Sequence, residues 1–196
     1  MYTVNMTGSK RGYHHGDLRA ALLREATALL ERYGPEGISF RAVTRAVGVS
    51  PNAPYNHFAS RHDLLAAIAE GGFTELAERQ ERTAAAAEPA DAWRALGRDY
   101  LEFAVQHPQL YRLMFGAGVA HWREVPAVAV AKGRSIQPLR SLVRHEPAAL
   151  GSWSLAHGLA MLLIDGSLDH AAAVGGGPDR LIDAVLGWFV DRQISG

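Results

Sequence analysis

The stretch from Ser39 to Phe58, SFRAVTRAVGVSPNAPYNHF, constrains the fold more than any other part of the sequence. Its apolar residues Phe40, Val43 and Val47 recur with a helical period, and Gly48 follows them. Glycine supplies the positive φ angle that a tight turn between two helices requires. The side chain of Ser39 is suited to cap the first segment. The stretch therefore predicts two short helices that are joined by a tight turn.

The start of the second helix can be placed at either of two residues. Pro51 suits the first turn of a helix capped by Ser50, but Pro54 would then remove the first intrahelical hydrogen bond. If Asn52 is the cap instead, Pro54 lies harmlessly in the first turn. We expect a late or irregular start, and we expect Phe58 to turn inward and lock the unit.

Helical periodicity continues through most of the chain, and the sequence contains no sustained period-two alternation typical of β-strands. Clear amphipathic helices are expected at 17–33, 61–86 and 179–193, and Ser60 opens the second of these with a capping-box pattern. A helix that is apolar nearly all round is expected from about 148 to 170. We predict an all-α fold of about nine helices, in which an N-terminal three-helix unit precedes a C-terminal helical bundle.

A helix-turn-helix can place its second helix in the major groove of DNA while its first helix crosses the backbone. Asn52 is suited to pair with a base edge, whereas Tyr55 and His57 can donate hydrogen bonds to phosphates. The simpler alternatives are an ordinary helical hairpin and, for Tyr55, a place in the core. The candidate DNA-binding residues are Ser39, Arg41, Arg45, Ser50, Pro51, Asn52, Ala53, Tyr55, His57 and Arg61.

Aromatic and methionine side chains in the second half of the chain can line a cavity for a largely apolar small molecule. Plain core packing is the alternative for each of them, and for His157 the alternative is a hydrogen-bonded core histidine. The candidate pocket residues are Tyr100, Phe103, Tyr111, Met114, Phe115, Trp122, Trp153, His157 and Met161.

The last two long helices are the expected homodimer surface, since a pair from each subunit can pack as four helices. The same side chains can instead fill the core of their own protomer. The candidate interface residues are Leu159, Leu162, Leu163, Leu186 and Phe189.

Short motifs in both halves resemble the TetR (tetracycline-repressor) family of one-component bacterial transcription regulators. In the first half they are VTRAVGVS at 43–50, YNHF at 55–58, Ser60-Arg61 and Leu64-Leu65. In the second half, HPQLYRLMF at 107–115 and SWSLAHGLAMLLIDG at 152–166 resemble the branch whose regulatory domain bears a Trp…His-Gly signature.

The chain departs from the family pattern at two places in the first half. Thr44 stands where the family usually has Ala, and Ala53-Pro54 replaces the usual pair of a hydroxyl and an aliphatic residue. The base contacts are therefore not carried over with the motif. The resemblance implies a homodimer, a ligand cavity in the C-terminal bundle and release from DNA when the ligand binds.

The balance of charged residues differs between the first 60 residues and the rest of the sequence. Residues 1–60 carry seven Lys and Arg against four Asp and Glu, whereas residues 61–196 carry thirteen against sixteen. Cysteine is absent from the sequence, which excludes disulfides and thiolate metal sites. We expect a flexible arm at 1–15, a helix-turn-helix DNA-binding domain at 16–62 and a ligand-binding and dimerisation domain at 63–196.

The sequence shows no nucleophile elbow, no glycine-rich phosphate loop and no paired carboxylates in an apolar context, so we predict no catalytic residue, cofactor or metal site. The longest apolar stretch, near 153–164, is too short for a membrane span. We predict a ligand-responsive repressor that binds a pseudo-palindromic double-stranded operator at the nucleoid in the bacterial cytoplasm. An all-α protein that sequesters a small molecule without a DNA role is the alternative.

Overall fold

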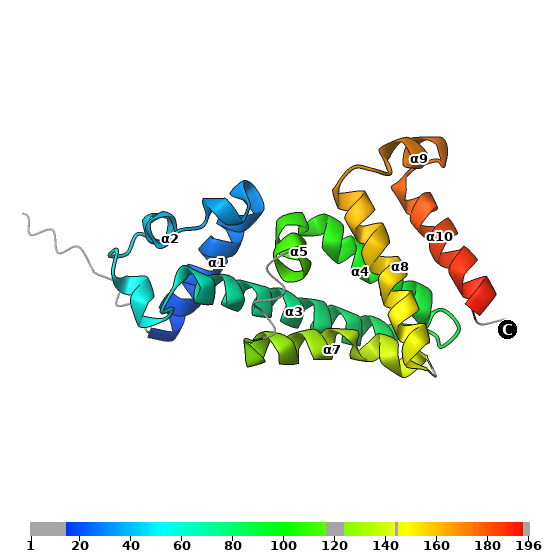
Figure 1. Cartoon of the computed structure of the whole chain (residues 1–196), viewed down its shortest axis with the longest axis horizontal. Helices are drawn as coiled ribbons and strands as arrows, with labels where there is room; N and C mark the ends of the chain where they lie inside the picture. The colour runs from blue at the N-terminus through cyan, green and yellow to red at the C-terminus, as the bar shows by residue number, and fades with distance from the viewer. Residues whose placement is uncertain (1–14, 117–123, 144, 194–196) are drawn as a thin grey trace, which may run out of the picture.

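The computed structural model of the chain describes residues 15–116, 124–143 and 145–193, and these residues form an elongated arrangement of helices (Figure 1). The prediction of an all-α fold with about nine helices is confirmed over this part of the chain. Short 3-10 helices also occur, η1 (Pro35–Gly37) and η2 (Ala53–Asn56). The α-helices are α1 (His15–Tyr33), α2 (Phe40–Val47), α3 (Arg61–Ala86), α4 (Ala92–Gln106), α5 (Pro108–Phe115), α7 (Pro126–Leu142), α8 (Glu146–Ile164), α9 (Asp169–Val174) and α10 (Pro178–Gln193).

The N-terminal unit is formed by α1, α2 and η2. Ser39 caps α2, because its Oγ accepts a hydrogen bond from the backbone N–H of Ala42 at 3.1 Å. Gly48 ends α2 in the left-handed conformation with φ of 78°. Val43 and Phe58 are 1% and 3% exposed and close the unit on α1. The predicted cap, turn and inward phenylalanine are therefore confirmed.

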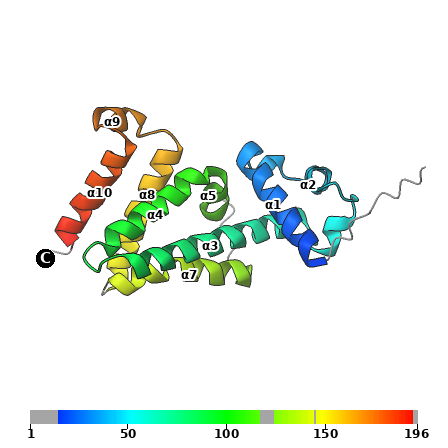
Figure 2. The ribbon, with the colours of Figure 1, turned by 180° about the vertical axis from the view of Figure 1, so that it is seen from behind.

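Helix α3 joins the N-terminal unit to the bundle. It begins at Ser60, whose Oγ accepts from the N–H of Asp63 at 3.1 Å, which is the serine half of the predicted capping box. Figures 1 and 2 show α3 running from the N-terminal unit along the bundle, with α7 beside it. A Cβ at Gly72 of α3 would lie 2.6 Å from Sδ of Met114 and 3.0 Å from Cδ1 of Leu110. Helix α5 can therefore approach α3 closely because residue 72 has no side chain.

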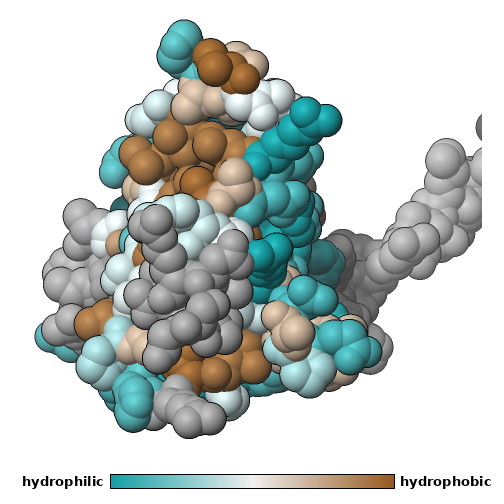
Figure 3. Space-filling view, turned by 90° about the vertical axis from the view of Figure 1, so that its right-hand side faces the viewer, coloured by the Kyte–Doolittle hydropathy of each residue, from teal (hydrophilic) through white to brown (hydrophobic). Residues whose placement is uncertain are grey.

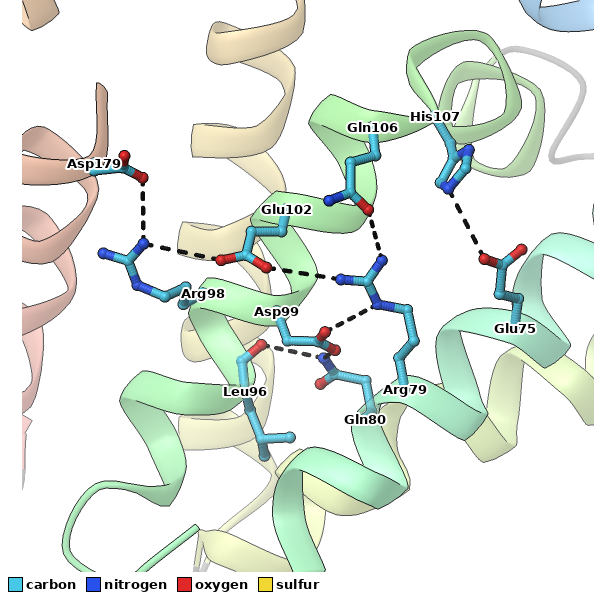
Figure 4. A network of polar contacts seen from close by, with 10 residues as sticks. All are labelled: Glu75, Arg79, Gln80, Leu96, Arg98, Asp99, Glu102, Gln106, His107 and Asp179. Atoms are coloured by element: carbon cyan, nitrogen blue, oxygen red, sulfur yellow. Dashed lines mark hydrogen bonds and ion pairs between the residues drawn. The ribbon is translucent and has the colours of Figure 1, made fainter. Parts of the chain in front are cut away.

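A polar network fixes α3 against α4 and α4 against α10 (Figure 4). Arg79 donates to Oδ1 of Asp99 at 2.9 Å, and Gln80 donates to Oδ2 of the same carboxylate at 2.7 Å. On the other side of α4, Arg98 forms ion pairs with Asp179 and Asp183 of α10. Arg79 and Asp99 are 17% and 14% exposed, so solvent and salt screen their attraction less than that of a surface pair.

The prediction of one continuous helix over about 148–170 is wrong at its C-terminal end. Helix α8 stops at Ile164, and Gly166 follows in the left-handed conformation with φ of 69°. A helix cannot continue through that conformation, so the chain turns and starts the separate helix α9.

Candidate functional sites

The exposed side of the helix-turn-helix lies around the turn between α2 and η2. Ser50, Pro51 and Asn52 are exposed there, and Tyr55 is 60% exposed. The ring of Tyr55 packs edge-on against Phe40, with centroids 4.9 Å apart. Its hydroxyl therefore stays at the surface on a ring that packing holds in place. The candidates Ser39, Arg41 and Arg45 are also exposed, on the adjoining turns of α2.

The second helix of the motif is short and irregular, as expected from its prolines. Asn52 precedes the 3-10 helix η2, and Pro54 lies in the first turn of η2 and is buried. The carbonyl of Pro54 accepts hydrogen bonds from the N–H groups of His57 and Phe58, both at 2.9 Å. Because Pro54 has no amide hydrogen, the chain turns here without forming a regular α-helix. The front of the motif is therefore a tight bend that presents few side chains.

Three of the predicted DNA-binding residues are bonded to the rest of the unit or partly buried in it. Arg61 donates from Nε to the carbonyl of Ile38 at 2.8 Å and also contacts the carbonyl of Pro35, so it ties the start of α3 to the α1–α2 connection. His57 and Ala53 are half-buried, and Nε2 of His57 is enclosed without a hydrogen-bond partner in the described structure. Arg61 therefore positions the start of α3, and Ala53 and His57 are less accessible to DNA than the exposed residues of the turn.

Asn56 is an exposed polar residue beside Tyr55 that the sequence analysis did not select. It is the second residue of the YNHF motif, whose last residue, Phe58, is buried. Its exposure follows from the 3-10 geometry of η2, which no residue spacing alone could establish.

A second candidate site lies in the core of the bundle, where α4, α5 and α8 meet. The hydroxyl of Tyr111 lies 2.6 Å from Nδ1 of His157 and 2.8 Å from the hydroxyl of Tyr100. The imidazole is stacked on Trp153 and on Tyr111, with centroid distances of 5.0 Å and 5.6 Å. Phe115 contacts the imidazole at a centroid distance of 5.0 Å. Four aromatic rings and one imidazole therefore surround a small set of polar atoms.

Burial determines the protonation of this cluster. Burial raises the pKa of Tyr100 and of Tyr111 far above the ordinary phenol value, so both hydroxyls keep their protons at neutral pH. Burial also lowers the pKa of His157, and the positive charge of Lys132 lowers it further. The cluster is therefore neutral at pH 7, with two phenol hydroxyls and an uncharged imidazole in hydrogen-bond contact.

A small cavity of about 30 Å³ adjoins this cluster, and a space of that size holds about one water molecule. The wall of the cavity is mostly apolar. The residues around it are Gln80, Trp93, Leu96, Gly97, Tyr100, Leu139, Ser152, Trp153 and Ala156.

The structure brings together five of the nine predicted pocket residues, Tyr100, Tyr111, Phe115, Trp153 and His157. Phe103 is fully buried beside His107 and Arg79, and Met114 is fully buried against Gly72. Both belong to ordinary packing between helices. Met161 is half-buried against the core, and Trp122 lies outside the described residues.

Sequence reasoning missed Lys132 and Phe73 at this site. The Nζ atom of Lys132 on α7 lies 5.9 Å from the ring centroid of Phe73 and 5.7 Å from that of Phe115. The spacing from the buried Val128 to Lys132 is one helical turn, which would have placed the lysine on the inner face of α7.

The predicted dimer residues divide between the surface and the core. Leu162 is 45% exposed and Leu163 is half-buried, whereas Leu159 is 7% exposed. Leu186 is a correction: it is 1% exposed and its Cδ2 would lie 3.1 Å from a Cβ at Gly97 of α4, so it fills the core of its own protomer. Nothing can be assigned to Phe189, whose side chain lies outside the described residues.

A groove of about 380 Å³ runs between α8 and α10, and its walls are almost entirely apolar. Figure 3 views the end of the molecule that carries α8, α9 and α10, and apolar residues are gathered on it. The residues that line the groove are Ser154, Leu155, Gly158, Leu159, Leu162, Leu168, Leu181 and Val185.

One long helix joins the helix-turn-helix of the N-terminal unit to a helical bundle with a polar, aromatic core. This arrangement defines the class of one-component transcription regulators. The family described as "Bacterial regulatory proteins, tetR family" matches residues 22–68, and the description "Tetracyclin repressor-like, C-terminal domain" matches residues 93–186. The chain belongs to the TetR family.

Known proteins of similar sequence and structure agree with this assignment. HTH-type transcriptional regulator Rv1816 of Mycobacterium tuberculosis is 27% identical over 121 residues, which are 60% of this chain and 51% of that protein. The chain thus spans about half the length of that curated relative. A solved structure of a protein of unknown function from Rhodococcus sp. RHA1 is 32% identical, covers 93% of this chain and 96% of that one, and has a TM-score of 0.76.

One structural neighbour was solved with its ligands bound. AibR, in complex with isovaleryl coenzyme A and operator DNA, shares the fold with a TM-score of 0.58 and 19% identity over 75% of this chain and 85% of that one.

Proposed function

We propose that this protein is a transcriptional repressor that binds a pseudo-palindromic operator as a homodimer and is released by a small molecule in its bundle core. The exposed, rigid turn at Ser50–Asn52 carries this proposal. It is bounded by the left-handed Gly48 on one side and by the packed ring of Tyr55 on the other. Because such a turn can enter the major groove without reorganising, its few side chains can contact DNA at low entropic cost.

AibR has the same fold and was solved in complex with isovaleryl coenzyme A and operator DNA, which supports the proposal that the present chain binds both a small molecule and DNA. In the present chain the helix-turn-helix lies before the start of α3, whereas the core site contacts α3 at Phe73, in the middle of the helix. The protein would work in the bacterial cytoplasm, at the nucleoid. A ligand in the core changes DNA affinity only by the difference in its own affinity for the DNA-bound and the released conformations.

The exposed apolar side of α8 supports the homodimer. Helix α8 has the length and the apolar composition of a membrane span, yet only 28% of that window is buried. The apolar groove beside α10 gives it a surface that a second copy can fill. Both copies would then present their turns to successive half-sites of the operator, about 34–36 Å or somewhat more apart.

The test is retardation of an operator that is selected from genomic fragments with the purified protein. Asn52→Ala should cost about 1–3 kcal/mol at the preferred site and relax its sequence preference, because Asn52 is the exposed amide at the turn. Tyr55→Phe should weaken binding to specific and random DNA alike, because it removes a phosphate donor but keeps the ring contact with Phe40.

Tyr33→Phe is the matched control, since Tyr33 is 55% exposed but lies on α1 away from the turn. It should leave both affinities unchanged. Affinity for the selected site should also fall steeply with salt concentration. Absence of retardation at low salt would remove the DNA role and favour a protein that only sequesters its ligand.

A further inference from the structure

We propose that the groove between α1, α3 and α5 binds a medium-chain aliphatic carboxylate, at a site separate from the core of the bundle. The three helices meet where the N-terminal unit joins the bundle (Figures 1 and 2). The groove has a volume of about 360 Å³. Ligand pockets commonly measure about 300–1,000 Å³, so the groove is large enough for a small molecule in its present conformation.

The groove is open because two adjacent glycines of α3 line it. A Cβ built at Gly71 would meet no atom within 4 Å, so the space beside this residue is free. A Cβ at Gly72 would lie 3.0 Å from Cδ1 of Leu110, so α5 closes the groove at that point. The remaining apolar residues of the lining are Leu23, Ala67 and Ile68. The walls contain no aromatic ring on which a flat ligand could stack, and they therefore favour an alkyl chain.

The α1 wall presents two hydrogen-bond donors to the groove. Arg24 and Thr27 are three residues apart, so they lie on the same face of the helix. Arg24 is exposed and Thr27 is half-buried, and neither side chain has a hydrogen-bond or ion-pair partner within the described residues. A guanidinium and a hydroxyl can donate to one carboxylate, and hydrogen bonds to charged groups are about twice as strong as neutral ones. These donors favour an anionic head group.

Glu75 is the other charged residue of the lining, on the α3 wall. Its Oε1 lies 3.8 Å from Nε2 of His107, directly before α5 (Figure 4). This carboxylate already faces an imidazole, whereas the guanidinium of Arg24 forms no ion pair within the described residues. The groove therefore holds an anion better than a cation.

A ligand in this groove contacts both parts of the molecule. Arg24 and Thr27 belong to the N-terminal unit, whereas Leu110 belongs to the bundle. One turn after Thr27, Glu31 of the same helix accepts hydrogen bonds from the first amides of α5. The ligand would therefore stabilise the present docking of α1 on α5. Its effect on operator affinity rests on the proposed function, whereas its binding does not.

The experiment compares octanoate with octanamide and octylamine, which share the same number of carbon atoms, by calorimetric titration of the purified full-length protein. We expect octanoate to bind about three- to tenfold more tightly than octanamide, and octylamine to bind no more tightly than the amide. Affinity should rise from hexanoate to octanoate by up to about fourfold for each added CH₂ group. Equal binding of acid and amide, or tighter binding of octylamine than of octanoate, would overturn the carboxylate.

Arg24→Gln should abolish the preference for the acid and leave the affinity for the amide unchanged, whereas Arg24→Lys should keep part of the preference. Arg32→Gln is the matched control, because it removes one positive charge from an exposed side chain of the same helix outside the groove. It should change neither affinity. A preference for the acid that survives in Arg24→Gln would overturn the head-group site.

Gly71→Leu should fill the groove and reduce the affinity for octanoate at least tenfold without lowering Tm, because the position is open and helical. Gly133→Leu is its control, since Gly133 is also exposed and open but lies on α7 outside the groove. Undiminished binding in a folded Gly71→Leu protein would show that octanoate binds elsewhere and overturn the site. If Gly71→Leu unfolds, the Arg24 variants decide alone.

Retardation of DNA separates this proposal from the proposed function. Binding of octanoate by a protein that retards no DNA would leave the groove site intact and overturn the repressor. Retardation of the operator by a protein that does not bind octanoate would leave the repressor intact and overturn the groove site.

Discussion

At the residue scale, Gly48 in the turn after α2 and Gly71 inside α3 show what glycine contributes in two different backbone conformations. Gly48 adopts φ of 78°, and a Cβ added there would meet no atom within 4 Å. Gly71 lies inside α3 with equally open space around its Cα, but its backbone is helical. Both positions therefore have room for a methyl group, and they differ in backbone conformation.

Gly48→Ala should lower the free energy of unfolding by about 1 kcal/mol, because an L-residue is disfavoured in the left-handed region. Gly71→Ala should raise it by up to about 1 kcal/mol, because alanine is the better helix former. Urea titration followed by circular dichroism measures both. The same sign for the two substitutions would show that the backbone conformation at Gly48 does not limit stability.

Helix α5 contacts both α1 of the N-terminal unit and the aromatic cluster in the core of the bundle. Its first amides, Gln109 and Leu110, donate to the carboxylate of Glu31 on α1 at 3.2 and 3.0 Å. The next residue, Tyr111, bonds His157 in the core. A movement of α5 in the core would therefore act directly on α1 of the N-terminal unit.

Glu31→Ala should destabilise the docking of α5 by about 1–2 kcal/mol, because it removes a charged cap from two backbone N–H groups at a helix N-terminus. Hydrogen exchange at the amides of Gln109 and Leu110 should accelerate roughly tenfold or more. Glu36→Ala is the control, since Glu36 is exposed on η1 and makes no such contact in the described structure. Unchanged exchange in Glu31→Ala would show that α5 is held by its apolar contacts alone.

At the scale of the whole molecule, the described residues of α8 and α10 leave an apolar face exposed. Leu162 is 45% exposed on α8, at the groove beside α10. Burying a leucine contributes about 1.5–3 kcal/mol, and a twofold interface would bury this side chain in both copies. We therefore propose this face as the surface that a second copy covers.

Leu162→Asp should convert the protein to a monomer at micromolar concentration, as measured by light scattering or sedimentation. Val130→Asp is the control, because Val130 is 72% exposed on α7, away from the groove, and should leave the dimer intact. A monomeric wild-type protein would contradict the assignment of this face.

Most of the helices, and the whole arrangement of cap, turn and second helix in the N-terminal unit, could be predicted from the sequence. Ser39, Gly48 and Ser60 act on backbone atoms at most four residues away, so their roles follow from local chemistry. The end of α8 is marked in the sequence by Asp165-Gly166-Ser167, where the apolar run stops and a glycine can take the left-handed conformation, but the prediction carried the helix past these residues.

The sequence by itself determined the all-α fold, the helix-turn-helix and the family, since these depend on periodicity, caps and motifs along the chain. Only the tertiary structure decided which side chains meet. Tyr111 and His157 are 46 residues apart in the chain, and Leu110 and Glu31 are 79 apart. The inward position of Leu186 was decided in the same way. Such contacts depend on how helices cross, and helical periodicity specifies an apolar face without specifying which partner covers it.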